Sequence, residues 1–232
     1  MSVGENYKIV MNRIAAAAAR AGREPSSVQL VVVTKTVDID RIREAVAAGA
    51  VLLGENRVQE AKEKIERLGP GARWHLIGHL QTNKAKYAVR LFDLIHSVDN
   101  LELAKELDKQ AAKLNRIQNV LIEVSIAGET AKAGVGIADA AGLVAEASQL
   151  AHISIKGLMT MPPYSEKPDD SRPYFKKLRE LSESIKKQNI PGVSMQELSM
   201  GMSGDFEVAI EEGATLVRVG TFIFGNRTGG AG

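Results

Sequence analysis

The chain has 232 residues, of which 44% are apolar and 25% charged, so it can bury one substantial core beneath a polar surface. Its formal net charge is +2, from 30 basic and 28 acidic side chains, and this balance argues against nucleic acid as a partner. The absence of cysteine excludes disulfides, thiolate metal sites and cysteine nucleophiles, and suits a reducing compartment.

The first predicted element is a helix at residues 3–21, where Tyr7, Val10 and Ile14 recur at helical steps before Gly22. Its charged side chains make this segment unlike a secretory signal. No apolar run in the sequence reaches the roughly 18 residues of a membrane span. We therefore expect a cytoplasmic protein with no membrane partner.

Eight short apolar runs follow, and each is predicted to be a strand: residues 30–34, 51–54, 73–78, 94–98, 120–125, 153–159, 197–200 and 215–219. The first run is β-branched and apolar on both faces, as is typical of a buried parallel strand. Helical patterns separate the runs, at residues 40–48, 58–68, 83–90, 99–114, 138–150, 172–188 and 206–211.

Eight strands that alternate with helices predict an α/β fold, a single-domain (β/α)8 TIM barrel with one extra helix at the N-terminus. An open doubly wound sheet is the alternative, although no Gly-x-Gly-x-x-Gly follows the first strand. No linker-like stretch divides the sequence, so residues 1–232 are predicted to be one domain. We expect residues 228–232 to form a frayed, flexible tail.

Lys35 stands where the first predicted strand ends. A lysine that leaves an apolar strand is partly desolvated, which lowers the pKa of its amine and makes it nucleophilic. In a barrel, the carboxyl ends of the strands form the functional face. The pattern therefore favours a Schiff-base lysine, with a side chain that simply extends to water as the alternative.

The eighth predicted strand places Arg218 and Gly220 on one face, followed by Thr221. If that face points into the barrel, Arg218 is a buried cation, and Gly220 and Thr221 offer N–H and hydroxyl groups to an anion. The loops after strands seven and eight are the recurrent phosphate site of such barrels. The alternative is an arginine paired with a carboxylate of the core.

The loop after the seventh predicted strand, residues 199–204, is rich in small residues and runs into a helix. Free N–H groups and the helix dipole favour a phosphate at such a position. An ordinary turn capped by Ser203 or Asp205 is the alternative.

Asn56 and His79 follow the second and third predicted strands and could contact a ligand at the barrel mouth. The alternatives are a helix-capping asparagine and a histidine satisfied within its loop. The four histidines form no pattern with metal-ligand spacing, so we expect no metal site.

Six segments together carry a resemblance to a known family: residues 32–36, 54–60, 74–84, 157–161, 198–203 and 217–221. They resemble the YggS/PROSC family, the pyridoxal phosphate homeostasis proteins. The resemblance covers nearly the whole chain and implies a monomeric barrel like the N-terminal domain of alanine racemase, the fold type III that binds pyridoxal 5′-phosphate (PLP).

By this resemblance, Lys35 carries the cofactor as a Schiff base and Arg218 faces its pyridine nitrogen. The residues that the resemblance implies at the cofactor site are Lys35, Asn56, His79, Met159, Ser199, Met200, Gly201, Ser203, Arg218, Gly220 and Thr221. An arginine beside that nitrogen keeps it unprotonated, which weakens the ring as an electron sink.

Alanine racemases take a catalytic tyrosine from a second domain across a dimer, whereas the eighth predicted strand here ends at residue 219 of 232. The prediction is therefore a vitamin B6 homeostasis protein that binds PLP without robust catalysis, with PLP-requiring apoenzymes as the partners that it would serve. The alternatives are a PLP-dependent amino-acid racemase and a barrel aldolase that uses Lys35.

Overall fold

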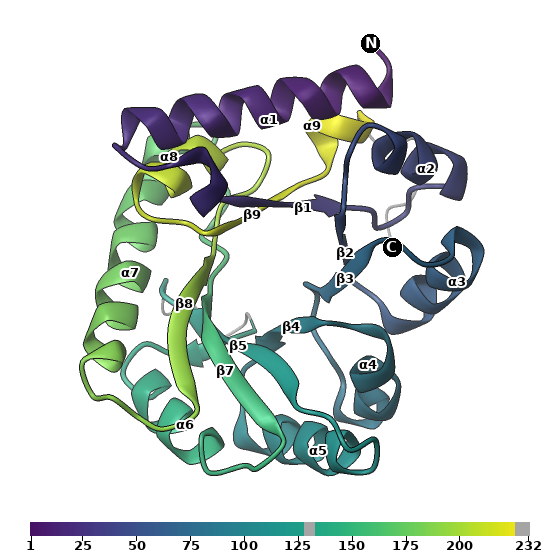
Figure 1. Ribbon diagram of the computed structural model, residues 1–232. Helices are drawn as coiled ribbons and strands as arrows, with labels where there is room; N and C mark the ends of the chain where they lie inside the picture. Colours follow the sequence, from purple (N-terminus) through teal and green to yellow (C-terminus); the bar gives the residue numbers. More distant parts are fainter. Residues whose placement is uncertain (128–132, 226–232) are drawn as a thin grey trace.

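Eight parallel strands close into a barrel surrounded by helices in the computed structural model, which describes residues 1–127 and 133–225 (Figure 1). The barrel strands are β1 (Gln29–Val33), β2 (Leu52–Glu55), β3 (Arg73–Leu76), β4 (Leu94–Val98), β5 (Gln118–Ser125), β7 (Ile153–Met159), β8 (Val193–Ser199) and β9 (Leu216–Val219). Pairing of β4 with β5 and of β1 with β9 closes the ring, so the predicted (β/α)8 barrel is confirmed. The predicted tail at 228–232 lies outside the described residues.

The helices that cover the barrel are α2 (Ile39–Ala47), α3 (Val58–Leu68), α4 (Ala85–Leu91), α5 (Leu101–Ala112), α6 (Ala140–Ala147), α7 (Arg172–Lys186) and α8 (Phe206–Glu211). Three short 3-10 turns were not predicted: η1 (Pro25–Ser27), η2 (Thr82–Lys84) and η3 (Pro168–Ser171). Two further elements were not predicted either: α9 (Thr221–Phe224) and β6 (Val135–Gly136), which pairs with β5 outside the barrel. None of the helices in the described ranges is long and apolar enough to cross a membrane.

Two hydrophobic clusters show which way the strand side chains point. A small cluster fills the barrel interior: Val31, Val33, Leu52, Ile77, Leu94, Leu121, Met159 and Leu216. The larger cluster lies between the strands and the helices. Because side chains alternate along a strand, residues an even number of positions from a member of the inner cluster also face inward. Arg218, two residues after Leu216 in β9, therefore points into the barrel.

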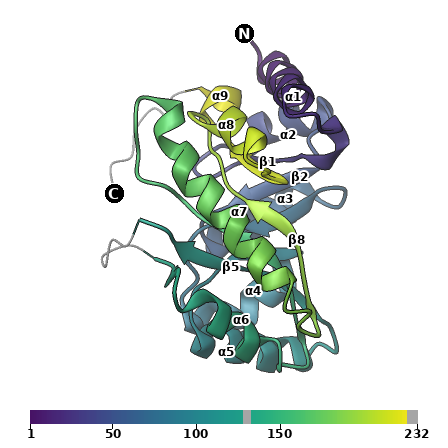
Figure 2. The ribbon, with the colours of Figure 1, turned by 90° about the vertical axis from the view of Figure 1, so that its left-hand side faces the viewer.

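The predicted extra helix, α1 (Val3–Arg20), lies against α2, α8 and α9 (Figure 1). It begins with a capping box, in which the Ser2 hydroxyl accepts a hydrogen bond from the Glu5 N–H and the Glu5 carboxylate accepts one from the Ser2 N–H. Viewed from the side, α7 runs along β8, with α8 towards α1 (Figure 2). Val10 and Ile14 bury the inner face of α1.

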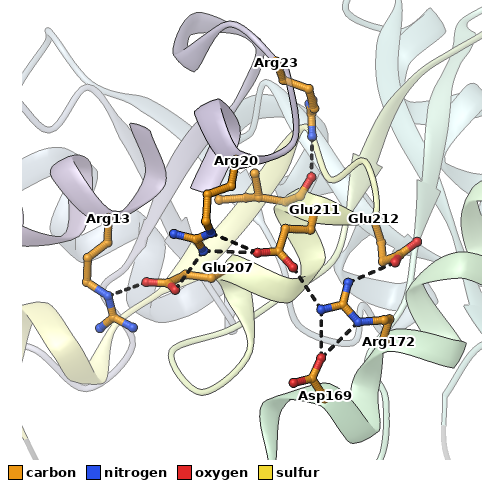
Figure 3. Close-up of polar contacts among 9 residues, drawn as sticks. Arg13, Arg20, Arg23, Asp169, Arg172, Glu207, Glu211 and Glu212 are labelled. Atoms are coloured by element: carbon orange, nitrogen blue, oxygen red, sulfur yellow. Dashed lines mark hydrogen bonds and ion pairs between the residues drawn. The ribbon is translucent and has the colours of Figure 1, made fainter. Parts of the chain in front are cut away.

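Ion pairs connect α1, α8 and the start of α7 on the outside of the barrel (Figure 3). Arg13 lies 2.7 Å from Glu207, and Arg20 lies within 3.2 Å of both Glu207 and Glu211. Arg172 reaches Glu211 from the other side, at 2.9 Å. Single exposed pairs contribute little, but a network of them fixes the position of α8, which directly follows the loop at 199–204.

Candidate functional site

A cavity of about 390 Å³ opens at the carboxyl ends of the strands, a volume within the range of about 300–1,000 Å³ found for small-molecule sites. Seven of the predicted site residues line it: Lys35, Asn56, His79, Ser203, Arg218, Gly220 and Thr221. The other four lie behind its wall and do not line it: Met159, Ser199, Met200 and Gly201. Segments more than 180 residues apart in the sequence thus meet in one pocket.

Lys35 reaches this cavity from the turn that follows β1, beside the apolar side chains of Val33 and Ile77. The turn is held from outside the barrel. The ammonium group of Lys64, on α3, donates hydrogen bonds to the Thr34 carbonyl and to the carboxylates of Glu55 and Glu60, each at 2.6 Å. We call Lys64, Glu55 and Glu60 the ionic clamp.

The ionic clamp fixes both neighbours of Lys35. The Thr34 hydroxyl donates to the Glu55 carboxylate at 2.6 Å, and the Thr36 N–H donates to the Glu60 carboxylate at 2.5 Å. Thr36 has a φ of +58°, which is unfavourable for a β-branched residue and persists only where surrounding contacts impose it. Burial raises the pKa of Glu55, and hydrogen bonds from Lys64 and Thr34 oppose that rise.

Arg218 brings a buried positive charge to the cavity. Its side chain is only 3% exposed, and it donates hydrogen bonds to the Ser199 hydroxyl and to the Thr160 carbonyl. Among the described residues it makes no ion pair, so the alternative of a partner carboxylate in the core is not observed. Burial lowers the pKa of Arg218 to about 10, which still leaves it cationic at neutral pH.

A chain of buried hydrogen bonds runs from Arg218 into the barrel. Nδ1 of His96 lies 2.9 Å from the Ser199 oxygen, and Nε2 of His96 lies 2.9 Å from Nδ1 of His75. Because Ser199 accepts from Arg218, its own hydrogen is available for His96 Nδ1. His96 then donates from Nε2 to His75, which assigns one tautomer to each ring.

His75 and His96, the two histidines of this chain of hydrogen bonds, are neutral. Burial, assisted by the charge of Arg73, lowers the pKa of His75 to about 3. The pKa of His96 lies well below its ordinary value because of burial and because His75 and Arg218 are close. Arg218 is therefore held by neutral acceptors, and its charge remains available to an anion or to an electron pair in the cavity.

Ser203, Gly220 and Thr221, which can offer hydroxyl and backbone N–H groups, also line the cavity. The first N–H groups of α9 have no acceptor within that helix, as at every helix start. Asp205 is the N-cap residue of α8, but its side chain makes no capping hydrogen bond to that helix, and its carboxylate instead accepts a hydrogen bond from the Met202 N–H at 2.7 Å. The hydrogen bond from Met202 to Asp205 thus closes the predicted turn, and Ser203 lines the cavity.

Asn56 and His79 line the wall formed by the ends of β2 and β3. Asn56 does not cap α3, whose N-cap residue is Arg57, and the His79 ring makes no hydrogen bond to another described residue. Gly78 permits the close approach of the two loops, because a Cβ there would lie 2.5 Å from the Asn56 carbonyl oxygen. Both side chains are therefore available to a ligand.

Sequence reasoning missed two parts of this site. The loop at 161–165, after β7, forms one side of the cavity, although the sequence marked it only as polar. His75 and His96 were considered only as metal ligands and rejected. Their inward-facing positions on β3 and β4, two residues from Ile77 and Leu94, were the available signal.

Residues 8–228 match the alanine racemase N-terminal domain family. The chain is 47% identical over 228 residues to the pyridoxal phosphate homeostasis protein of Aquifex aeolicus (strain VF5), covering 98% of this chain and 99% of that protein. It is 38% identical over 231 residues to the protein of the same name from Escherichia coli (strain K12), with 97% of each covered.

Solved structures agree with this similarity. PipY of Synechococcus elongatus PCC7942, solved with PLP bound, superposes with a TM-score of 0.81 at 41% identity and covers 91% of this chain and 100% of PipY. An alanine racemase of Clostridium difficile 630 superposes with a TM-score of 0.75 at 15% identity, over 97% of this chain and 58% of the racemase. At that identity the racemase shows a shared fold alone.

Proposed function

The chain belongs to the family of pyridoxal phosphate homeostasis proteins, and from this premise we propose that it binds pyridoxal 5′-phosphate as a Schiff base on Lys35. Its role is then intracellular vitamin B6 homeostasis. The observation that carries the proposal is the meeting of the Lys35 amine and the Arg218 cation, from the paired strands β1 and β9, in one cavity.

The groups that line the cavity fit this cofactor. An amine beside apolar walls can condense with an aldehyde, and small residues and hydroxyls at Ser203, Gly220 and Thr221 suit a phosphate. Arg218 is assigned to the pyridine nitrogen, and Asn56 and His79 to the ring. When bound, the cofactor supplies a reactive carbonyl carbon and an electron-withdrawing ring.

This chain's residues favour holding the cofactor over turning over a substrate. A permanent cation at Arg218 disfavours a proton on the neighbouring ring nitrogen, and that reduces the capacity of the ring to accept electrons. We propose a monomeric cytoplasmic carrier without robust catalysis that serves PLP-requiring apoenzymes. The similarity to alanine racemase is one of fold, which is weak support for a shared reaction.

The test is an absorbance spectrum of the purified protein with PLP, before and after borohydride reduction, with the modified peptide mapped. We expect a visible band and phosphopyridoxyl-Lys35 in the wild type, and neither in Lys35→Ala. Lys177→Ala, which removes an exposed lysine of α7, is the matched control and should load normally. A wild-type protein that stays colourless with PLP would refute the proposal.

A further inference from the structure

A second, smaller cavity of about 160 Å³ adjoins the main one and shares Met161 and Pro163 with it. Its walls are mostly apolar or small: Val124, Ser125, Ala127, Ala133, Met161 and Pro163. Among the residues that the structure describes, Glu123, from β5, is the one ionisable side chain that lines it. In the ring of strands, β5 stands directly opposite β1, which precedes Lys35.

Glu123 is a buried carboxylate without a partner in the described part of the chain. It is only 3% exposed and faces inward, two residues after Leu121 of the inner cluster. It makes no hydrogen bond or ion pair with any residue in 1–127 or 133–225. Burial, reinforced by the nearby Asp99 carboxylate, raises the pKa of Glu123 to about 7, and the charge of Arg218 opposes the rise.

Burying a carboxylate without a partner is costly, so such a group points to a ligand that would pair with it. The ligand must carry a positive charge to pair with the carboxylate. The rest of it must be mostly apolar, because the walls are mostly apolar or small. A bare metal ion does not fit, because Ca²⁺ and Mg²⁺ demand about six or more oxygen ligands. The described residues contain no cluster of three or more candidate metal ligands.

We propose that this second cavity binds a small primary ammonium ion, with its charge on the Glu123 carboxylate and its short apolar body against Met161 and Pro163. The size is suitable, because a cavity of about 150 Å³ can hold a molecule as large as benzene. The proposal deepens the proposed function and rests on it, because primary amines are the compounds that react with the aldehyde of the proposed cofactor.

The experiment titrates the full-length, PLP-free protein with n-propylammonium chloride at pH 8, by calorimetry and by NMR shifts of residues around the cavity. We expect saturable binding that weakens at least tenfold in Glu123→Gln, because a charge-assisted hydrogen bond is lost. Glu63→Gln, which removes an exposed carboxylate of α3, is the matched control and should bind normally. The uncharged 1-propanol and equal concentrations of KCl should not reproduce the effect.

A second variant tests the location without touching the carboxylate. Ala127→Leu adds bulk to the cavity wall and should also weaken propylammonium binding. Absence of saturable binding to the wild type, or equal affinity in the wild type and Glu123→Gln, would overturn the proposal. So would unchanged affinity in Ala127→Leu.

Cofactor loading separates this proposal from the proposed function. Glu123→Gln should still yield phosphopyridoxyl-Lys35 after borohydride reduction, at the wild-type level. Normal loading without propylammonium binding would remove the amine site alone. Propylammonium binding without any loading would instead remove the proposed function and leave the cavity as an ammonium site.

Discussion

His96 lies 2.9 Å from the Ser199 hydroxyl, so a neutral ring in the barrel interior sets which way that hydroxyl points. Ser199 can then accept from Arg218 with a lone pair while donating its hydrogen inward. The cation that faces the cavity is thus positioned by residues that never reach the cavity themselves.

Ser199→Ala should destabilise the protein, because it leaves buried donors on Arg218 and an acceptor on His96 without this partner. We expect the free energy of unfolding in urea to fall by about 1–3 kcal/mol. Ser203→Ala is the matched control, since Ser203 lines the cavity without a described protein partner, and it should change stability by less than about 0.5 kcal/mol. Equal stability of Ser199→Ala and wild type would contradict the assigned chain.

Acid should weaken the fold through His75. Its pKa in the folded protein, about 3, lies below the ordinary 6.5, so the unfolded chain takes up a proton first. The stability contribution is complete above pH 6.5 and is lost as pH falls towards 3, at about 1.4 kcal/mol for each unit of pKa difference. Urea unfolding of the wild type and His75→Gln across this range should show a shallower slope in the variant. Parallel slopes would speak against a neutral buried ring.

Glu123 has the opposite pH dependence. Its folded pKa, about 7, lies above the ordinary 4.5, so stability is greatest below pH 4.5 and falls as pH rises through 7. Glu123→Gln should therefore be more stable than the wild type at pH 8, by about 3 kcal/mol, and similar to it at pH 4. Asp99 and Arg218 are the charged groups that act on this carboxylate and stay unchanged in the comparison. A variant that is less stable at pH 8 would contradict an unpaired Glu123.

Lys64→Met should leave the buried Glu55 carboxylate and the half-buried Glu60 carboxylate of the ionic clamp without their cation. Breaking a buried ion pair costs about 3–5 kcal/mol, and we expect that loss in urea unfolding. Lys62→Met is the matched control on the same helix, where the exposed pair with Glu66 spans 3.8 Å and contributes little. The double variant Lys64→Met/Glu55→Gln should recover part of the loss.

The same variants test whether the clamp positions Lys35. We expect slower incorporation of PLP at Lys35 in Lys64→Met than in Lys62→Met, measured as the rate at which the visible band appears. If both load at the wild-type rate, the clamp contributes to stability alone.

The first strand was predictable because residues 30–33 form an unbroken apolar run, as is typical of a buried parallel strand. The start of β8 was missed, since Ser194 and Gln196 interrupt the pattern and Met195 has a φ of +44°. Lys35 and Arg218 were predictable from their places at strand ends. The ionic clamp and the contact between His75 and His96 were not predictable from the sequence. Both depend on how far neighbouring strands and helices are shifted along one another.

The pairing of β1 with β9, in which Val31 lies beside Arg218, joins the first and last strands of the barrel. During translation Lys35 leaves the ribosome long before Arg218. The pocket around the Lys35 amine therefore forms only after nearly the entire polypeptide has been synthesised. A molecule bound across that junction would stabilise the closed ring, because it binds the closed ring and not the open one. Occupancy would then report that the ring has closed, and loss of the ligand would remove this stabilisation of the closed ring.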